Sequence, residues 1–344
     1  MASLQALESS LNDDGIQIIY AFSEHTKDCP WVKDIQKDNN VIVFVPNSFF
    51  ASIVFLIKTL EQYKPKGIYT HLIEKKQLLV AKIAKFFTGS KAKVAAHYHN
   101  SYLYNLGWIK NTLKKAMMHK DTLIGCSKDV ADDFKNAGLK NPYYFVENAV
   151  NFERLDTFEA KQKDGRYHIL MFGWDYERKG VDLAIMACDV LRKKYNHIAL
   201  DICVSSDPGA VKDYICSLFG KVPGWVTLLP PIENVATYFV NSDLFISPSR
   251  AEGFCYAIIE AAYCKLISVS SKIPGQYKKD MPEIIWHETE NTDDLANKIA
   301  SAYLLCDKDR NKLTSILRKR AIAQYGIENW VTKVKEILSK NDII

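Results

Sequence analysis

The stretch EGFCYAIIE, residues 252–260, begins with one carboxylate, Glu252, and ends with a second, Glu260. The residues around Glu260 read CYAIIEAAYC and are apolar on nearly every side. This pattern predicts a buried helix, which follows a strand-like segment at 243–249. A carboxylate in such a helix needs a partner, because burying an unpaired charge is costly. We therefore interpret Glu260 as a ligand-binding residue and not as a solvated surface charge.

The start of the predicted helix is suited to a phosphate. Gly253 allows a ligand to come close to the backbone, and a helix N-terminus offers N–H groups and the positive end of the helix dipole. Glu252 and Glu260 would lie about 12 Å apart along the helix axis. Two carboxylates at that separation cannot bind one atom, but they can contact two ends of an elongated ligand, such as a sugar and a ribose joined by a pyrophosphate.

Strand-like and helix-like segments alternate along the whole chain. The strand candidates occupy residues 17–23, 41–46, 67–72, 93–99, 122–127, 142–150, 168–173, 198–204, 225–230, 243–249 and 266–271. Continuous apolar strands alternating with helices predict parallel sheets that are covered on both faces. A polar, non-periodic stretch at 151–166 separates two such sets. We expect two doubly wound α/β domains, 1–155 and 156–324, with the chemistry in the cleft at the carboxyl ends of their strands.

Composition narrows the class of protein. The 344 residues carry a net charge of +5 and are 48% hydrophobic, which supports packed cores and excludes a disordered chain. This charge is too small to predict nucleic-acid binding. No apolar run reaches the about 20 residues of a membrane-spanning helix, and no signal peptide is visible, so we expect a cytoplasmic protein. The cysteines and histidines are not spaced as zinc ligands, so we expect no metal.

Two further segments carry polar groups at predicted strand ends. GWDYERKG, 173–180, follows a strand and precedes a helix, and its Lys179 can point its ammonium at a pyrophosphate. By itself this is also ordinary turn chemistry. HYHNS, 97–101, ends a strand of the first half, where side chains face the predicted cleft. One histidine there would more often be structural, but His97 and His99, followed by Asn100 and Ser101, favour a functional site.

Together these segments resemble the retaining glycosyltransferases of the GT-B fold, glycosyltransferase family 4, most strongly over 142–275. GWDYERKG resembles the glycine–basic–five–glycine loop of that family, and EGFCYAIIE resembles its E-x7-E segment. SKIPGQYK, with Gly275, resembles the loop that follows, and VENAVN resembles the segment before the hinge. YGIENW resembles the start of the last helix, so the resemblance implies that 325–344 returns to the N-terminal domain.

The resemblance also implies roles for individual residues. Lys179, Glu252 and His99, or less readily His97, would be the catalytic residues, and Glu260 would bind the ribose. The implied donor-binding residues are Gly173, Trp174, Arg178, Lys179, Ile232, Gly253, Phe254, Cys255 and Glu260. The implied acceptor-side residues are His97, Asn100 and Ser101. The donor would be a nucleotide sugar, most simply a UDP-sugar, used as a substrate with no cofactor and no metal.

Two departures from the family pattern bear on activity. Trp174 stands where the family usually has arginine, and Arg178 would have to substitute for it. The strand and glycine-rich loop that should precede the first helix are also missing from the sequence. Either residues upstream of Met1 supply them, or the strand at 17–23 takes the central place in a smaller sheet.

The segment LGWIKNTLKKAMMHK, 106–120, bears on the acceptor. It predicts a helix with an apolar stripe and several lysines, which is either an ordinary surface helix or one that meets anionic headgroups and a lipid-linked acceptor. We expect a glycosyltransferase that acts on a bacterial surface glycan, located in the cytoplasm or at the inner face of the plasma membrane. The alternatives are a non-catalytic GT-B subunit and a sugar-nucleotide epimerase.

Overall fold

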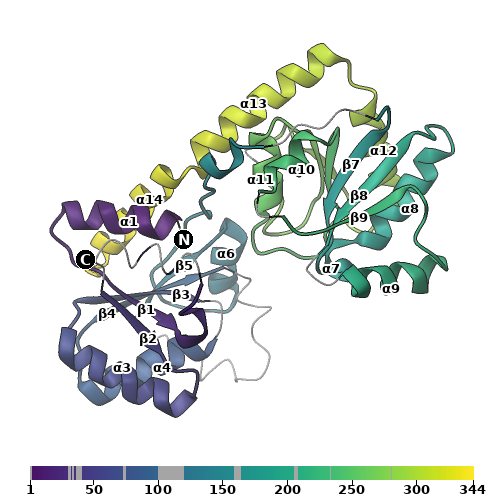
Figure 1. The fold of residues 1–344 in the computed structure, drawn as a ribbon. Coiled ribbons are helices and arrows are strands. Elements are labelled where there is room, and N and C mark those ends of the chain that lie inside the picture. The colour runs from purple at the N-terminus through teal and green to yellow at the C-terminus, as the bar shows by residue number, and fades with distance from the viewer. Residues whose placement is uncertain are drawn as a thin grey trace. The chain divides into compact units, whose positions relative to one another are not determined.

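The computed structural model describes residues 2–29, 32, 35, 41–72, 75–99, 120–158, 164–204, 208–232, 234–279 and 281–344 (Figure 1). The chain divides into two compact units. Unit 1 comprises Met1–Ala149 and Ile327–Ile344, and unit 2 comprises Val150–Gly326. Each unit consists of parallel strands and helices, and the two are described separately.

Unit 2 contains a six-stranded parallel sheet in the order β12-β11-β10-β7-β8-β9. The strands are β7 (Tyr167–Phe172), β8 (Ile198–Cys203), β9 (Val226–Leu229), β10 (Leu244–Ser247), β11 (Ser268–Ser271) and β12 (Ile285–His287). From β7 the chain first builds outward through β8 and β9 and then returns to place β10 on the other side of β7. The carboxyl ends of β7 and β10 therefore form the switch point at which ligands of such sheets bind.

Helices alternate with these strands in the sequence. They are α7 (Tyr176–Lys179), α8 (Val181–Arg192), α9 (Pro208–Phe219), α10 (Ala236–Val240), α11 (Tyr256–Tyr263), α12 (Thr292–Tyr303) and α13 (Asp307–Tyr325). The core of the unit joins apolar residues of β7 and β8 to α8 and α12. All six residues of β8 are buried, as expected for a strand of a parallel sheet that is covered on both faces.

Unit 1 contains two parallel sheets among its described strands. The strands β3 (Gly67–Leu72), β4 (Lys93–Tyr98), β5 (Thr122–Gly125) and β6 (Tyr143–Phe145) form one sheet in that order. β1 (Ile19–Ser23) and β2 (Val41–Val45) form a separate pair. Among the described strands, β1 pairs with β2 alone and is not part of the four-stranded sheet. The helices of this part of unit 1 are α1 (Ala2–Asp13), α3 (Phe49–Tyr63), α4 (Lys75–Thr88) and α6 (Lys128–Asn136).

The last helix, α14 (Ile327–Lys340), belongs to unit 1. It places Trp330, Val334 and Leu338 in one apolar cluster with Leu7 and Leu11 of α1. Figure 1 shows the two helices side by side, purple and yellow, although they come from opposite ends of the chain. The apolar face of α14 is thus buried against the start of the chain.

The boundary between the units differs from the one expected at 155. The structure assigns 150–155 to unit 2, because Leu155, in a short 3-10 helix (Glu153–Leu155), packs against Ala236 and Tyr263 of that unit. Other strand boundaries differ from the sequence analysis by a few residues, and β12 is absent from it. None of the helices in the described residues combines the length and the apolar character that crossing a membrane requires.

Candidate functional site

Two loops of unit 2 meet at the switch point of its sheet. The first follows β7 and contains Lys179, and the second follows β10 and contains Glu252. The ammonium Nζ of Lys179 lies 2.6 Å from Oε1 of Glu252, and Ser249 Oγ donates to the same oxygen at 3.0 Å. The Lys179 and Glu252 side chains are 9% and 7% exposed. The structure therefore brings together two of the three predicted catalytic residues as a buried ion pair.

The glycines of the site are required by close packing. Gly180 and Gly275 both have a positive φ, at 70° and 75°. A Cβ on Gly180 would lie 2.3 Å from the carbonyl oxygen of Pro248, and one on Gly275 would lie 2.2 Å from that of Glu252. The loops after β7, β10 and β11 are thus held in backbone contact, which fixes the position of Glu252.

Arg178 and Trp174 complete the first loop. Arg178 Nη1 lies 3.1 Å from Oε2 of Glu252, so Glu252 is paired with two cations. The same nitrogen donates to the carbonyl of Ala251 at 2.9 Å. The Trp174 ring is 46% exposed, and the Lys179 ammonium lies 4.9 Å from its centroid, within the range of a cation–π contact. Trp174 therefore covers Lys179 at the position where arginine was expected.

The second glutamate, Glu260, lies on α11 and is 5% exposed. It pairs with Arg154, whose side chain is 42% exposed. Burial raises the pKa of the Glu260 carboxyl, and the Arg154 charge opposes that shift. All residues of α11 from Ala257 to Tyr263 are buried, so the sequence-based prediction of a buried helix is confirmed, and the partner of its carboxylate is an arginine from the boundary segment.

The remaining predicted donor-side residues lie around this centre. Phe254 and Cys255 are buried at the start of α11, with Cys255 as its N-cap residue. The Lys278 ammonium lies 4.5 Å from the Phe254 ring. Gly173 directly follows β7, and a Cβ there would lie 2.6 Å from Ile202 Cγ2. Ile232 lies in the loop between β9 and α10 and is partly exposed.

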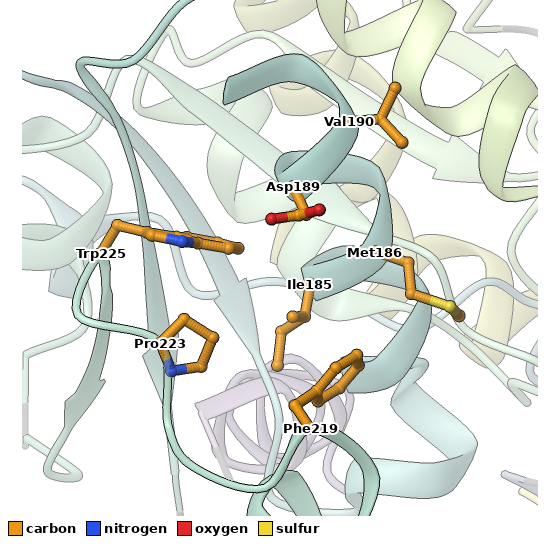
Figure 2. Close-up of a pocket in the computed structure, with 7 residues that line it drawn as sticks. All are labelled: Ile185, Met186, Asp189, Val190, Phe219, Pro223 and Trp225. Atoms are coloured by element: carbon orange, nitrogen blue, oxygen red, sulfur yellow. The ribbon is translucent and has the colours of Figure 1, made fainter. Parts of the chain in front are cut away.

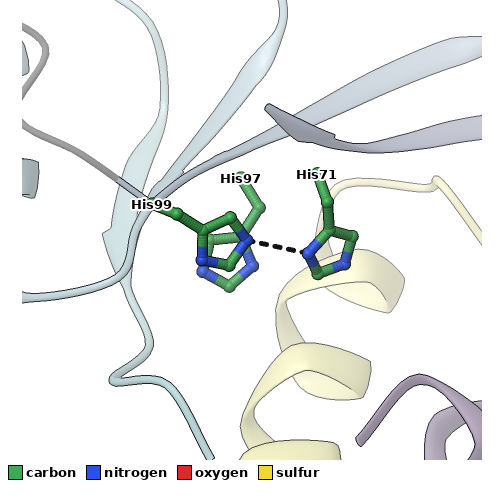
Figure 3. Close-up of side chains that lie close together, drawn as sticks. All are labelled: His71, His97 and His99. Atoms are coloured by element: carbon green, nitrogen blue, oxygen red, sulfur yellow. Dashed lines mark hydrogen bonds between the residues drawn. The ribbon is translucent and has the colours of Figure 1, made fainter. Parts of the chain in front are cut away.

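In unit 1, three histidines lie on one face of the sheet at the ends of β3 and β4 (Figure 3). His71 pairs with His97 in the strand register, and His99 is two residues further along the chain. His71 Nδ1 lies 2.9 Å from His99 Nε2, and His99 Nδ1 lies 3.0 Å from Asn148 Oδ1. Tyr69 Oη lies 2.8 Å from His97 Nδ1.

These histidines are held neutral by their surroundings. Burial lowers the pKa of His71 to about 3, and the neighbouring His99 acts in the same direction. Burial also lowers the pKa of His97 and of His99. His97 is fully buried, whereas His99 is partly exposed. Of the two histidines predicted to face a ligand, His99 is therefore the more accessible.

The three histidines are also the one group in the described residues with ligand atoms close enough to suggest a metal. One ring nitrogen of each lies within 4.8 Å of the others. Imidazole suits zinc, but a tetrahedral Zn²⁺ holds its nitrogen ligands about 3.3 Å apart at Zn–N distances of about 2.0–2.1 Å. His71 and His99 are already hydrogen bonded to each other, so a metal would bind only after that bond broke and the rings rotated.

Some predicted residues lie outside the described part of the chain. These are Asn100, Ser101 and the segment 106–120 except Lys120. Conversely, the sequence analysis missed Arg154, His71 and Asn148. His71 had a usable signal, because it is the next-to-last residue of the strand candidate 67–72, and the structure pairs it with His97 on the neighbouring strand. Arg154 had none, since it lies in the segment interpreted as a linker.

A separate shallow pocket of about 400 Å³ lies elsewhere on unit 2 (Figure 2). Trp225 and Pro223 form one side, and Ile185 and Met186 of α8 form the other. Its remaining lining residues are Asp189, Val190 and Phe219. No residue predicted for the donor site lines this pocket.

Part of this chain is similar in sequence to proteins of known class. Residues 166–304 match the family described as glycosyl transferases group 1. The matched range includes Lys179, Glu252 and Glu260. Over 130 residues, 36% of this chain, the sequence is 28% identical to the D-inositol 3-phosphate glycosyltransferase of Paenarthrobacter aurescens (strain TC1). That match covers 32% of the relative, so the chain spans about a third of the length of the curated relatives it matches.

Solved structures show the fold of the whole chain. A glycosyltransferase from Rickettsia africae ESF-5 superposes with a TM-score of 0.79 over 99% of this chain and 94% of its own, at 17% identity. Anabaena HepE in complex with UDP-glucose gives 0.73 over 92% and 90%, at 15% identity. Sucrose-phosphate synthase from Thermosynechococcus elongatus gives 0.74 over 98% and 92%, also at 15% identity. The predicted GT-B fold of two Rossmann-like domains is confirmed.

Proposed function

We propose that this chain is a glycosyltransferase that moves a sugar from a nucleotide-sugar donor to a glycan acceptor with retention of configuration. The observation that carries this proposal is the buried pair Lys179–Glu252 just before α11, with Glu260 buried within that helix. A cation, a helix N-terminus and two separate carboxylates match the parts of an elongated donor, namely the pyrophosphate, the sugar and the ribose. The group 1 match covers all three residues.

Each residue has a distinct role in this proposal. The Lys179 ammonium and the start of α11 hold the pyrophosphate, and the Glu260 carboxylate accepts hydrogen bonds from the ribose hydroxyls. Glu252 faces the donor sugar. Lys179, Arg178 and the helix dipole stabilise the negative charge that develops on the leaving phosphate, which is the task that a metal ion performs in other transferases.

The chemical step follows from these roles. The bond between the anomeric carbon and the phosphate oxygen breaks while a bond to the acceptor oxygen forms on the same face of the sugar. The acceptor proton passes to the leaving phosphate. His99 of unit 1 is the side chain that contacts the donor sugar, because it lies at the carboxyl end of its strand and is the more accessible of the two predicted histidines.

A UDP-sugar is the donor we propose, since UDP-glucose is the ligand named for HepE. The test is a thermal-shift screen of UDP-, GDP- and ADP-sugars, followed by an assay of transfer and donor hydrolysis. A ligand at 100 times its Kd should stabilise the fold by about 2.7 kcal/mol. A screen in which no nucleotide sugar shifts the unfolding temperature would contradict the proposal.

For the acceptor we propose a lipid-linked bacterial surface glycan. In this proposal the segment 106–120 binds the membrane surface that carries the acceptor. The support is the run of lysines in that segment, each worth about 1 kcal/mol at an anionic membrane. Replacing Lys110, Lys114 and Lys115 with glutamine should weaken binding to vesicles that contain anionic lipid. Equal binding of the variant and the parent would contradict this part of the proposal.

A second candidate function is a non-catalytic GT-B subunit that binds an acceptor or stabilises an active partner. The observation that favours it is Trp174, which covers Lys179 where the family usually has arginine. Donor hydrolysis by the isolated chain separates the two candidates, because a non-catalytic subunit would show none.

A further inference from the structure

The donor and the acceptor of each hydrogen bond in the histidine group can be assigned by starting from Asn148. The side-chain oxygen of Asn148 can only accept, so the ring nitrogen that faces it, His99 Nδ1 at 3.0 Å, must donate. A neutral imidazole has one donor and one acceptor nitrogen, so His99 Nε2 carries a lone pair. His71 Nδ1, 2.9 Å away, must then be the donor to that lone pair.

The geometry of the His71–His99 bond fits this assignment. The ring planes differ by 15° and the ring centroids lie 5.1 Å apart, which is compatible with an N–H···N bond of 2.9 Å between the facing nitrogens. The remaining nitrogen, His71 Nε2, is buried and has no hydrogen-bond partner in the described residues. If His71 donates to His99, the atom left without a partner is a buried lone pair on His71 Nε2. If His99 donated instead, a buried N–H would be left without a partner, which is the rarer case in proteins.

Packing also holds the imidazole rings of His71, His97 and His99 in place. Trp330 of α14 lies against the group, with its ring centroid 6.2 Å from that of His71 and 6.3 Å from that of His97. His97 stacks on His99 at 4.6 Å, and Tyr69 binds its Nδ1. His99 is therefore held by Asn148 at one nitrogen, by His71 at the other, and by His97 on one face.

We infer that His71 is a positioning residue, which holds His99 in the Nδ1–H tautomer and in a single ring orientation. It does so through the two hydrogen bonds that join His71 to His99 and His99 to Asn148. This rests on the proposed function, in which His99 contacts the donor sugar. A catalytic imidazole that is free to rotate loses rate because a displacement of about 1 Å can cost about 100-fold. His71 thus acts on the reaction through His99.

The tautomers can be measured directly on the unmodified protein. Multiple-bond ¹H–¹⁵N spectra of ¹⁵N-histidine-labelled protein at neutral pH should show the proton of both His99 and His71 on Nδ1. The spectra need neither donor nor activity, so they test the inference even if the chain transfers no sugar. Finding the proton of His99 on Nε2 would overturn the inference.

Two variants of matched size test the catalytic consequence. His71→Asn keeps an N–H donor close to the position of Nδ1, whereas His71→Leu has a similar volume and no donor. We expect His71→Leu to lower kcat on the order of 100-fold with little change in donor Kd, and His71→Asn to restore most of that loss. His25→Gln, at an exposed histidine of unit 1, is the control and should match the parent.

The outcomes separate this inference from the proposed function. Equal kcat for the parent and both His71 variants, in an active enzyme, would overturn the inference alone. No transfer and no donor hydrolysis by the parent would overturn the proposed function, and the spectra would then still decide the tautomer. If His71→Leu fails to fold, His71→Asn and the spectra of the parent remain decisive.

Discussion

Lys179 and Glu252, 73 residues apart in the sequence, form an ion pair of 2.6 Å in which both side chains are almost completely buried. In the proposed function a donor pyrophosphate binds this same ammonium. Donor binding would therefore weaken or replace the Lys179–Glu252 ion pair. The Glu252 carboxylate would then need a contact with the donor to compensate for the weaker pairing. That exchange links the two predicted roles, because neither residue can be changed without affecting the other.

We predict that Lys179→Ala destabilises unit 2 by about 3–5 kcal/mol, since it leaves the buried Glu252 carboxylate with only part of its charge compensated. The same variant should lose donor binding. The measurement is urea unfolding together with calorimetric titration of the donor. Lys272→Ala, which removes an exposed pair with Glu288, is the control and should cost less than about 1 kcal/mol.

The double variant Lys179→Met/Glu252→Gln separates stability from function. It removes both charges from the buried site, so it should recover most of the lost free energy of unfolding and still fail to bind the donor. Recovery of donor affinity in that variant would show that the cation at position 179 does not hold the pyrophosphate.

The second prediction concerns Glu260, whose pKa is raised by burial. A raised carboxyl pKa means that the stabilising contribution is present below the ordinary glutamate pKa and is lost as pH rises through the raised value. At pH 7 the charged form is therefore a cost to folding. Glu260→Gln should leave the free energy of unfolding at pH 7 unchanged or higher.

The same change should weaken donor binding by about 1.5–3 kcal/mol, because a charge-assisted hydrogen bond to the ribose is lost. Glu288→Gln, at an exposed pair, should alter neither quantity. A folded Glu260→Gln protein with the parent affinity for the donor would remove Glu260 from the ribose site.

The sequence was enough to predict that unit 2 has a parallel, doubly wound α/β fold and to locate the two loops of its site. Strands such as β8 are buried along their whole length and are therefore apolar throughout, so each stands out from the amphipathic helices around it. The glycines were informative for a related reason. Gly180 and Gly275 lie where a Cβ would collide with a neighbouring backbone. Such positions require glycine, and a glycine can be read directly from the sequence.

Partnerships between distant residues were not predictable. Arg154 lies 106 residues from Glu260 and comes from a segment without periodicity. The His71–His99 bond depends on the register of β3 with β4, which no short pattern records. β12 has only three residues and is too short to show alternation or an apolar run. For Arg154 and for the His71–His99 bond the deciding interaction is tertiary, so the local sequence did not show the contact itself, although it did show that His71 lies near the end of a strand candidate.

A third prediction follows from the neutral histidines of unit 1. Histidine in an unfolded chain titrates near pH 6.5, and the pKa of His71 in the fold is about 3. The unfolded chain therefore takes up protons first as pH falls. The stabilising contribution is complete above about pH 6.5 and is lost progressively toward pH 3.

Urea unfolding between pH 7.5 and pH 5 should show this loss. His71→Asn should flatten the dependence, because the substituted residue cannot titrate. The same slope in the parent and the variant would mean that His71 does not contribute to acid sensitivity.

The fourth prediction is that transfer does not depend on a metal ion. Lys179 and Arg178 already supply positive charge at the proposed leaving group. Dialysis against a chelator should leave kcat unchanged when the donor is a nucleotide sugar. Loss of turnover that magnesium or manganese restores would contradict this prediction and would direct attention to ligands outside the present site.

The last prediction tests whether Trp174 limits or abolishes activity. Its ring lies over the Lys179 ammonium, with 4.9 Å between Nζ and the ring centroid, and it is half exposed. Trp174→Arg would place a second cation beside Lys179, where the proposed pyrophosphate binds. A bidentate guanidinium contact to phosphate is a strong interaction, so donor affinity should rise by about 1.5–3 kcal/mol.

Trp174→Ala is the matched control, because it uncovers Lys179 without adding charge. In an active enzyme, Trp174→Arg should lower the KM for the donor, and Trp174→Ala should leave it close to that of the parent. If the parent and Trp174→Ala have no activity and Trp174→Arg gains it, then Trp174 is what makes the chain a non-catalytic subunit. If Trp174→Arg binds the donor no better than Trp174→Ala, position 174 does not face the pyrophosphate, and Lys179 and Arg178 are the basic residues of this loop that do.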